Sequence, residues 1–150
     1  MPQITGAISK AVFIVELSLD GTAWVDVSGA ATTVEIGGGD LMSGEAYTAD
    51  GPHAIVTVGK AQPQEVTVAI VYTEGLTDPF KVALTYKASA GPCYIRYKPA
   101  GTGTGRFLFK SDIPGRILNV LPPSGDAGTG DVSMTEFTWR GPALTQSAQI

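Results

Sequence analysis

Apolar and polar residues alternate along most of this chain with a period of two, which is the pattern of half-buried β-strands. In Ala11–Leu19, one set of alternate residues is apolar and the other becomes polar towards the end of the run. The apolar set is Phe13, Val15, Leu17 and Leu19, and the other set includes Glu16 and Ser18. The same alternation runs through Glu65–Tyr72, where Glu65 and Thr67 lie opposite the apolar set of Val66, Val68, Ile70 and Tyr72.

Turn residues separate these runs. Asp20-Gly21 follows the first strand and predicts a tight hairpin turn, because glycine tolerates a positive φ. Shorter strand-like runs follow in "TAWVDVSG", "TTVEI", Ala54–Val58, "CYIRYK", "RFLFK", "GRILNVLP" and "VSMTEFTWRG". We count roughly seven or eight strands from this pattern.

One segment changes to a helical period. In "TDPFKVALTYKASAG", Asp78 stands at the N-cap position and Pro79 fits the first helical position. Phe80, Ala83 and Leu84 recur at helical spacing, and Gly91 ends the unit. The sequence therefore predicts a single helix of about three turns, which covers part of one sheet.

The stretch Gly37–Pro52, "GGGDLMSGEAYTADGP", shows neither period. Its five glycines make ordering costly, and long loops without structure in compact domains are usually functional or disordered. It also carries Leu41, Met42 and Tyr47, which a solvated linker does not need. We therefore expect an irregular arm that becomes ordered when it docks on a partner.

The predicted fold class is mainly β: a sandwich or barrel with one flanking helix and a long Gly-rich loop. A length of 150 residues fits a single domain, residues 1–150. We expect a flexible N-terminal segment at 1–10 and a flexible C-terminal tail at 142–150, where no period is visible. The strands outnumber what one short helix shields, so some sheet edges and one sheet face are expected either to be solvated or to meet another chain.

Composition narrows the possible functions. Charged residues make up 16% of the chain, below the usual quarter, and the net charge is −4 without any basic cluster. This argues against a nucleic-acid-binding surface. The start "MPQITG" has no basic region followed by an apolar one, and no apolar run reaches about 18 residues. We expect neither a secretory signal nor a membrane span, and synthesis in a cytoplasm.

Candidate chemistry is sparse. The single cysteine, Cys93, excludes an intrachain disulfide and is expected to be a small buried residue. The single histidine, His53, has no metal ligand or serine nucleophile at a suitable spacing, and "GTGTG" precedes a strand, so it does not form a phosphate cradle. We therefore expect no enzyme activity, no metal and no cofactor. Trp24 and Trp139 are interpreted as core or interface residues, and the Cys…Trp…Cys framework of immunoglobulin domains is absent.

Taken together and in order, the segments resemble the major tail protein, the tail tube subunit of long-tailed, non-contractile bacteriophages. The resemblance runs from about Ala11 to Thr145. It rests on "VELSLDGTAWVDVSG", "GEAYTADGP", "VTVGKAQPQEVTVAIVYTEGLTDPF" leading into one helix, "CYIRYKPAG" and "SMTEFTWRGPALT".

The resemblance implies that six subunits form a ring and that rings stack into a virion tail tube. The strands of all six chains would form one continuous barrel, which removes the open edges. The long loop would reach an adjacent ring, with contacts from Leu41, Met42, Glu45 and Tyr47. Implied partners are copies of the chain, a tape measure protein, a tail tip or initiator complex and a tail terminator protein, in a virion made in the bacterial cytoplasm.

The resemblance also implies a bore through which DNA passes without specific binding. The candidate residues for the lumen are Glu16, Glu65, Thr67 and Glu136, which stand opposite the apolar positions of their strands. Acidic side chains repeated around a ring would repel phosphate and let DNA slide.

Two alternatives remain open at this point. One is the tube protein of a contractile tail, a secretion system or a gene transfer agent. The other is a monomeric carbohydrate-binding β-sandwich, which would need exposed aromatic residues on one face.

Overall fold

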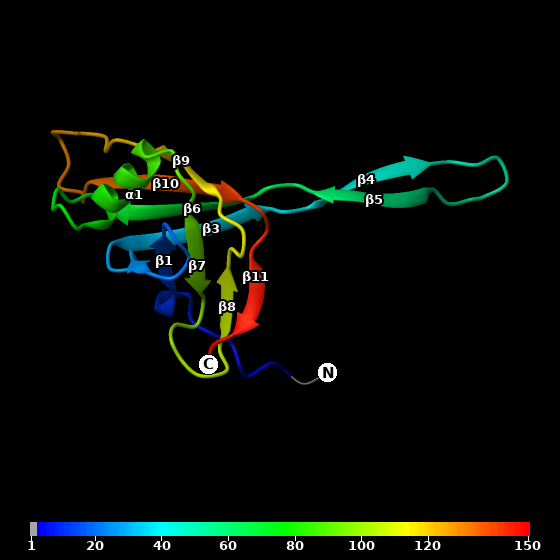
Figure 1. Ribbon diagram of the computed structural model, residues 1–150, viewed down its shortest axis with the longest axis horizontal. Helices are drawn as coiled ribbons and strands as arrows, with labels where there is room; N and C mark the ends of the chain where they lie inside the picture. The colour runs from blue at the N-terminus through cyan, green and yellow to red at the C-terminus, as the bar shows by residue number, and fades with distance from the viewer. Residues whose placement is uncertain (1–2) are drawn as a thin grey trace.

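A computed structural model describes residues 3–150 and shows two packed β-sheets from which a two-stranded arm projects (Figure 1). These residues contain eleven strands, one α-helix and one 3₁₀ turn at Lys10–Val12. The strands are β1 (Ile14–Ser18), β2 (Val25–Asp26), β3 (Ala31–Gly38), β4 (Leu41–Ala46), β5 (Ile55–Ala61), β6 (Gln64–Val71), β7 (Tyr94–Lys98), β8 (Phe107–Lys110), β9 (Arg116–Val120), β10 (Met134–Gly141) and β11 (Thr145–Ala148). The helix α1 spans Pro79–Ala88.

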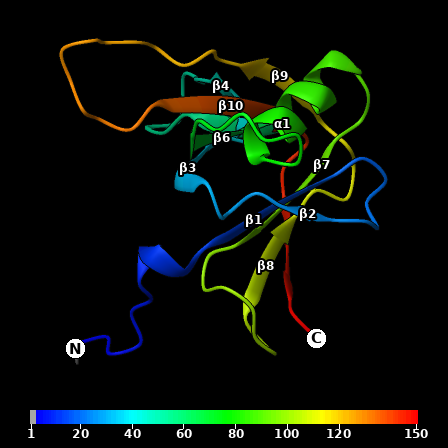
Figure 2. The ribbon, with the colours of Figure 1, turned by 90° about the vertical axis from the view of Figure 1, so that its left-hand side faces the viewer.

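The sheets form a sandwich, which confirms the predicted fold class. One sheet has the order β11-β8-β7-β1-β2, the other β3-β6-β10-β9, and every pairing within them is antiparallel. Figure 2 shows them as two layers, with α1 at the side where β9 lies. The arm, β4 paired with β5, continues outward from β3 and β6.

The core lies between the two sheets and follows the alternation of the sequence. Val15 and Leu17 of β1 are fully buried from one side, and the alternate apolar residues of β6 and β10 are fully buried from the other. Each such side chain contributes about 1.5–3 kcal/mol by leaving water. Trp139 is the largest fully buried side chain, and its indole Nε1–H donates to the Cys93 carbonyl at 2.8 Å.

The first strand ends earlier than its pattern predicts. β1 stops at Ser18, so Leu19 is 48% exposed and does not join the apolar face. Ser18, expected on the polar face, is fully buried because the following turn folds over it. Its hydroxyl accepts the Gly21 N–H at 2.9 Å and donates to the Asp20 carboxylate at 3.0 Å.

The turn at Asp20-Gly21 is present but wider than a two-residue hairpin, since β2 starts at Val25. Gly21 has a φ of 80°, as the turn chemistry requires. The Asp20 carboxylate accepts the backbone N–H groups of Ala23 and Thr22. These bonds, with that from the Ser18 hydroxyl, hold the pKa of Asp20 well below its usual range.

The predicted helix is confirmed, with Asp78 as N-cap and Pro79 at its start. The Asp78 side chain accepts the Gly75 N–H at 3.0 Å, so it braces the preceding loop instead of capping the helix. Ala83 is fully buried, and Phe80 and Tyr86 pack against the core. Leu84, expected on the buried face, is 36% exposed.

Two expectations about chain segments are wrong. Leu41–Ala46, inside the stretch predicted to be irregular, is strand β4, which pairs with β5 along the arm. Thr145–Ala148, inside the predicted flexible tail 142–150, is strand β11 and pairs with β8. In the predicted N-terminal segment 1–10, residues 3–9 form no helix or strand, and residues 1–2 lie outside the described part.

Replacing Trp139 with alanine should reduce the free energy of unfolding by about 3–5 kcal/mol, because it leaves a large cavity and removes the hydrogen-bond donor to the buried Cys93 carbonyl. The half-buried Trp24 is the matched control, and Trp24→Ala should cost much less. Urea denaturation followed by circular dichroism measures both. Equal losses for the two variants would contradict this account of the core.

Candidate functional site

The outer face of the four-stranded sheet gathers three of the four residues predicted for a lumen. In β6, the buried residues alternate with Glu65, which is exposed, and Thr67, which is half-buried. In β10, the same alternation turns Glu136 outward between the buried Thr135 and Phe137. We call this surface the sheet face.

Strand register arranges the sheet face in rows. Glu65 of β6 lies opposite Arg140 of β10, and Arg140 lies opposite Arg116 of β9. In the next row, Thr67 lies between Glu35 of β3 and Thr138 of β10, with the two threonine hydroxyls 3.5 Å apart.

The sheet face therefore carries both signs of charge, with three carboxylates (Glu35, Glu65 and Glu136) and two guanidinium groups (Arg116 and Arg140). Its net charge is −1 per chain. Sequence reasoning missed Glu35, although the alternation of "TTVEI" places it opposite Val34 and Ile36. It also missed Arg116, because a residue at the start of a short strand has no clear periodicity.

Glu16 does not lie with the other three candidates. It belongs to β1 in the five-stranded sheet, where it forms ion pairs with Arg96 and, at 3.6 Å, with Lys98. The Arg96 guanidinium in turn lies 4.4 Å from the ring centre of Trp24. This cluster neutralises Glu16 on the other side of the sandwich.

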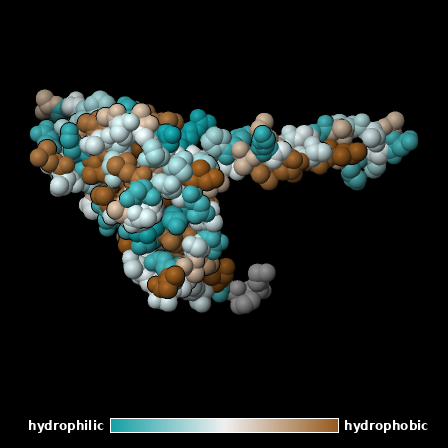
Figure 3. Space-filling model, in the orientation of Figure 1, coloured by the Kyte–Doolittle hydropathy of each residue, from teal (hydrophilic) through white to brown (hydrophobic). Residues whose placement is uncertain are grey.

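The arm is the second distinctive feature. All residues of β4 and β5 are exposed, and within residues 3–150 these two strands pair only with each other. An isolated two-stranded hairpin is marginally stable in water. The arm nevertheless presents large apolar side chains, shown as brown patches in Figure 3. They are Leu41, Met42, Tyr47, Ile55, Val56 and Val58, of which Tyr47 is 78% exposed.

The predicted contact residues all lie on this arm. Leu41, Met42 and Glu45 belong to β4, and Tyr47 follows it towards the tip. Glu45 lies opposite Val56 in the hairpin register. The sequence analysis did not predict that β5 adds exposed apolar residues to the arm, because those residues have the pattern of an ordinary buried strand.

A pair of glycines forms the root of the arm. Gly38 and Gly39 have φ values of 74° and 79°, and the Gly39 N–H donates to the Pro63 carbonyl at 3.1 Å. A Cβ on Gly38 would lie 2.5 Å from that carbonyl oxygen. The kink between β3 and β4 therefore depends on glycine at this position.

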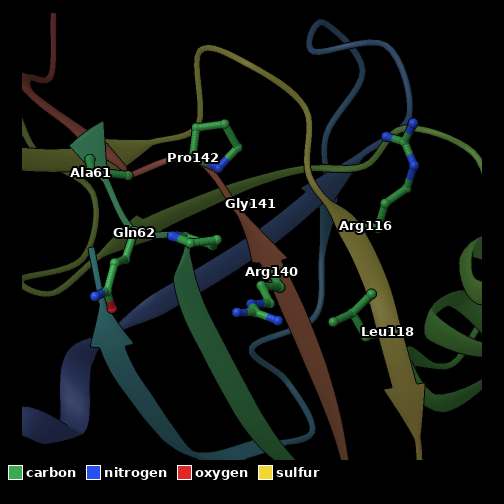
Figure 4. Close-up of a pocket in the computed structure, with 9 residues that line it drawn as sticks. Ala61, Gln62, Arg116, Leu118, Arg140, Gly141 and Pro142 are labelled. Carbon is green, nitrogen blue, oxygen red and sulfur yellow. The ribbon is translucent and has the colours of Figure 1, made fainter. Parts of the chain in front are cut away.

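Two open hollows flank the root. The larger, of about 540 Å³, is lined by the arm base and by β9 and β10, with Gln62, Leu118 and Arg140 around it (Figure 4). The other, of about 480 Å³, includes Glu35, Glu65 and Thr67. Arg140 borders both hollows.

The remaining candidate features of the described residues are a metal site, a membrane-spanning helix, the single histidine and the single cysteine. Among residues 3–150, no group of three or more His, Cys, Asp and Glu side chains is placed to hold a metal ion. In the same range, no helix is long and apolar enough to cross a membrane. His53 is exposed near the tip of the arm. Cys93 is buried as predicted, and burial raises the pKa of its thiol to about 12.

The carbohydrate-binding alternative requires a platform of exposed aromatic rings. The strongly exposed aromatic residues of the described chain are Tyr47 on the arm and Phe107 on β8. Tyr47 follows the end of β4 on the arm, whereas Phe107 lies in the five-stranded sheet, so the two rings form no common platform.

The sheet edges are the remaining feature. β3 and β9 are the edges of the four-stranded sheet, and β2 and β11 are those of the five-stranded sheet. Edge strands present unpaired backbone groups that another strand can satisfy.

Comparison with solved structures finds chains of the same fold. A chain of the sheath/tube terminator of the PVC extracellular contractile injection system matches with a TM-score of 0.71 and 18% identity, over 97% of this chain and 100% of that chain. A chain of the PVC sheath–tube complex gives 0.67 and 18%, over 97% and 95%. A chain in the tail of an empty gene transfer agent particle, determined with C6 symmetry, gives 0.68 and 11%, over 97% and 100%.

At these identities the likeness shows the fold alone, which this chain shares with chains of the PVC sheath–tube complex, the PVC sheath/tube terminator and the gene transfer agent tail. No family model matches the sequence, and no curated protein matches it.

Replacing Gly38 with alanine should lower the free energy of unfolding by about 1–2 kcal/mol and redirect the arm, because the new Cβ meets a backbone carbonyl at positive φ. Gly37→Ala is the matched control, since a Cβ there meets nothing within 4 Å. Chemical denaturation of both variants measures the difference. A Gly38→Ala protein as stable as Gly37→Ala would show that the kink needs no glycine.

Proposed function

We propose that this protein is a structural subunit of a tail tube, which assembles with copies of itself into rings that stack around a central channel. The observation that carries the proposal is a tail tube fold whose four-stranded sheet ends in two unpaired edges. Copies of the chain would supply the missing neighbours and close the sheet into a barrel without edges. The C6 symmetry of the gene transfer agent tail supports six subunits per ring.

The arm gives the tube its second contact. An exposed, apolar hairpin gains stability when it docks, and its length carries it well beyond the body of its own subunit (Figure 1). We assign Leu41, Met42, Glu45 and Tyr47 to contacts with an adjacent ring. Ile55, Val56 and Val58 of β5 would contribute to the same contact.

The sheet face would line the channel. It exposes Glu65, Thr67 and Glu136, and its net charge of −1 per subunit repels DNA weakly when repeated around a ring. The mixed charges make this wall less acidic than the carboxylates alone suggest. Glu16 belongs to the other sheet, so in the proposed tube it would lie away from the channel.

The tube would form part of a virion or a phage-like particle, with no catalytic activity and no cofactor. Its partners would be a tape measure protein, a tail tip or initiator complex and a tail terminator protein, and DNA would pass without specific binding. A non-contractile phage tail follows from the sequence resemblance. The tube of a contractile injection system is the second candidate, because chains of the PVC sheath–tube complex and terminator share the fold.

Removing the arm should separate folding from polymerisation. Replacing residues 40–62 with a short Gly-Ser linker should leave the sandwich intact, since the arm contributes nothing to the core. The variant should unfold like the full chain and fail to form stacked tubes. Removing Leu41–Ala49 alone should have the same effect.

Circular dichroism and negative-stain electron microscopy of concentrated protein provide the two measurements. Tubes of normal length from the armless variant would refute the role of the arm. Failure of the full chain to form rings or tubes under any condition, including with an initiator complex, would refute the proposed function.

Replacing Glu65 with lysine should leave assembly intact and cause the channel to bind DNA. The change converts the net charge of the sheet face from −1 to +1 per subunit, which favours phosphate binding at low salt. Preformed tubes of the variant should retain duplex DNA at low salt and release it as salt rises. In particles, DNA delivery should fall.

The matched control is Asp126→Lys, which makes the same charge change in the exposed loop after β9. DNA retention and delivery identical in the two variants would remove Glu65 from the channel.

A further inference from the structure

The two edges of the four-stranded sheet carry opposite charges. Glu35 lies on edge strand β3 and Arg116 on edge strand β9, and both are exposed on the sheet face. Neither side chain forms an ion pair within residues 3–150. Arg116 instead donates to the carbonyl of its neighbour Gly115 at 3.0 Å, and it extends away from Arg140 (Figure 4).

Apolar side chains accompany both charges. Ile36 of β3 is 40% exposed, and Leu118 of β9 is 51% exposed. Leu121, directly after β9, is also exposed. Each edge therefore combines free backbone groups, exposed apolar surface and one charge, which is the composition of an interface left open.

Strand direction allows the two edges to pair. Successive strands in the order β3-β6-β10-β9 run antiparallel, so β9 runs opposite to β3. A copy rotated about the tube axis presents its β3 edge to the β9 edge of its neighbour with the antiparallel alternation unbroken. α1 packs beside β9 from the core side, where Ile117 and Val120 are buried, so the outer face of the junction stays open.

On the basis of the proposed tube function, we propose that β9 of one copy pairs with β3 of the next and that Arg116 forms an ion pair with Glu35 across this junction. Where the rows of the sheet face continue without offset, Arg116 faces Gly37 of the next copy and is diagonal to Glu35. Diagonal neighbours lie about 7–8 Å apart, within reach of an arginine side chain. An offset of two residues places the two charges directly opposite.

The same charges select the symmetry of the assembly. A two-fold contact between two β3 edges that is centred near Glu35 would bring Glu35 against Glu35, and one between two β9 edges centred near Arg116 would bring Arg116 against Arg116. Like charges opposite each other on a sheet are destabilising. The head-to-tail junction is the pairing that joins opposite charges, and head-to-tail contacts build closed rings instead of two-fold dimers.

Charge exchange at the two positions tests this pairing. Glu35→Arg and Arg116→Glu should each raise the critical concentration for ring and tube assembly about tenfold, because every junction then opposes like charges. The double variant E35R/R116E should assemble like the unmodified chain, since each junction again joins opposite charges. Sedimentation and electron microscopy measure assembly, and circular dichroism confirms folding.

Mixing the two single variants gives a second test that does not depend on either one assembling alone. In an alternating ring, every junction of an equimolar mixture of E35R and R116E joins opposite charges, and a ring with an even number of subunits can close. The mixture should therefore assemble where each component alone fails. Glu136→Arg is the matched control, because it makes the same change on the inner strand β10 of the same face.

Single variants that assemble as readily as E136R would overturn the pairing and leave the tube function standing. Folded single variants that fail, with neither the double variant nor the mixture restoring assembly, would also overturn it. Failure of the unmodified chain to assemble would overturn the tube function and the pairing together.

Discussion

The edge strands β3 and β9 present backbone N–H and C=O groups that no strand of the described chain satisfies on their outer sides. In many soluble proteins such edges are short, carry charged side chains or are covered by a helix or loop. Here β3 is eight residues long and continues directly into an arm that is also unpaired with the body. We propose that further copies of the chain complete these edges, and this one requirement would connect the sheet, the arm and the proposed channel.

The hydrophobic pattern of the sequence was sufficient to predict the elements that pack against the core. Alternation identified the buried faces of β6 and β10, and the helical period located α1 with its Asp78-Pro79 start. The pattern failed to predict strands that are exposed and are held by backbone pairing instead of by burial. β4 is exposed on both faces and is held by its ladder with β5, and β11 is likewise an exposed edge strand, so neither leaves a periodic signal.

The candidate site was predictable in part for the same reason. Glu65, Thr67 and Glu136 were placed together because their strands alternate strictly around buried neighbours. Glu16 has the same local pattern, but which sheet a strand joins depends on long-range pairing, here with β7 and its Arg96 and Lys98. The sequence alone does not show that Glu35 and Arg116 lie on the two opposite edges of one sheet. That placement follows from the order of the strands.

Hydrogen–deuterium exchange of free and assembled protein measures edge completion most directly. The account predicts that amides on the outer sides of β3 and β9 exchange quickly in the free chain and become protected in the tube. Amides of β6 and β10, already paired on both sides, should change little. Tubes in which β3 and β9 exchange as fast as in the free chain would contradict the claim that copies of this chain complete its sheet.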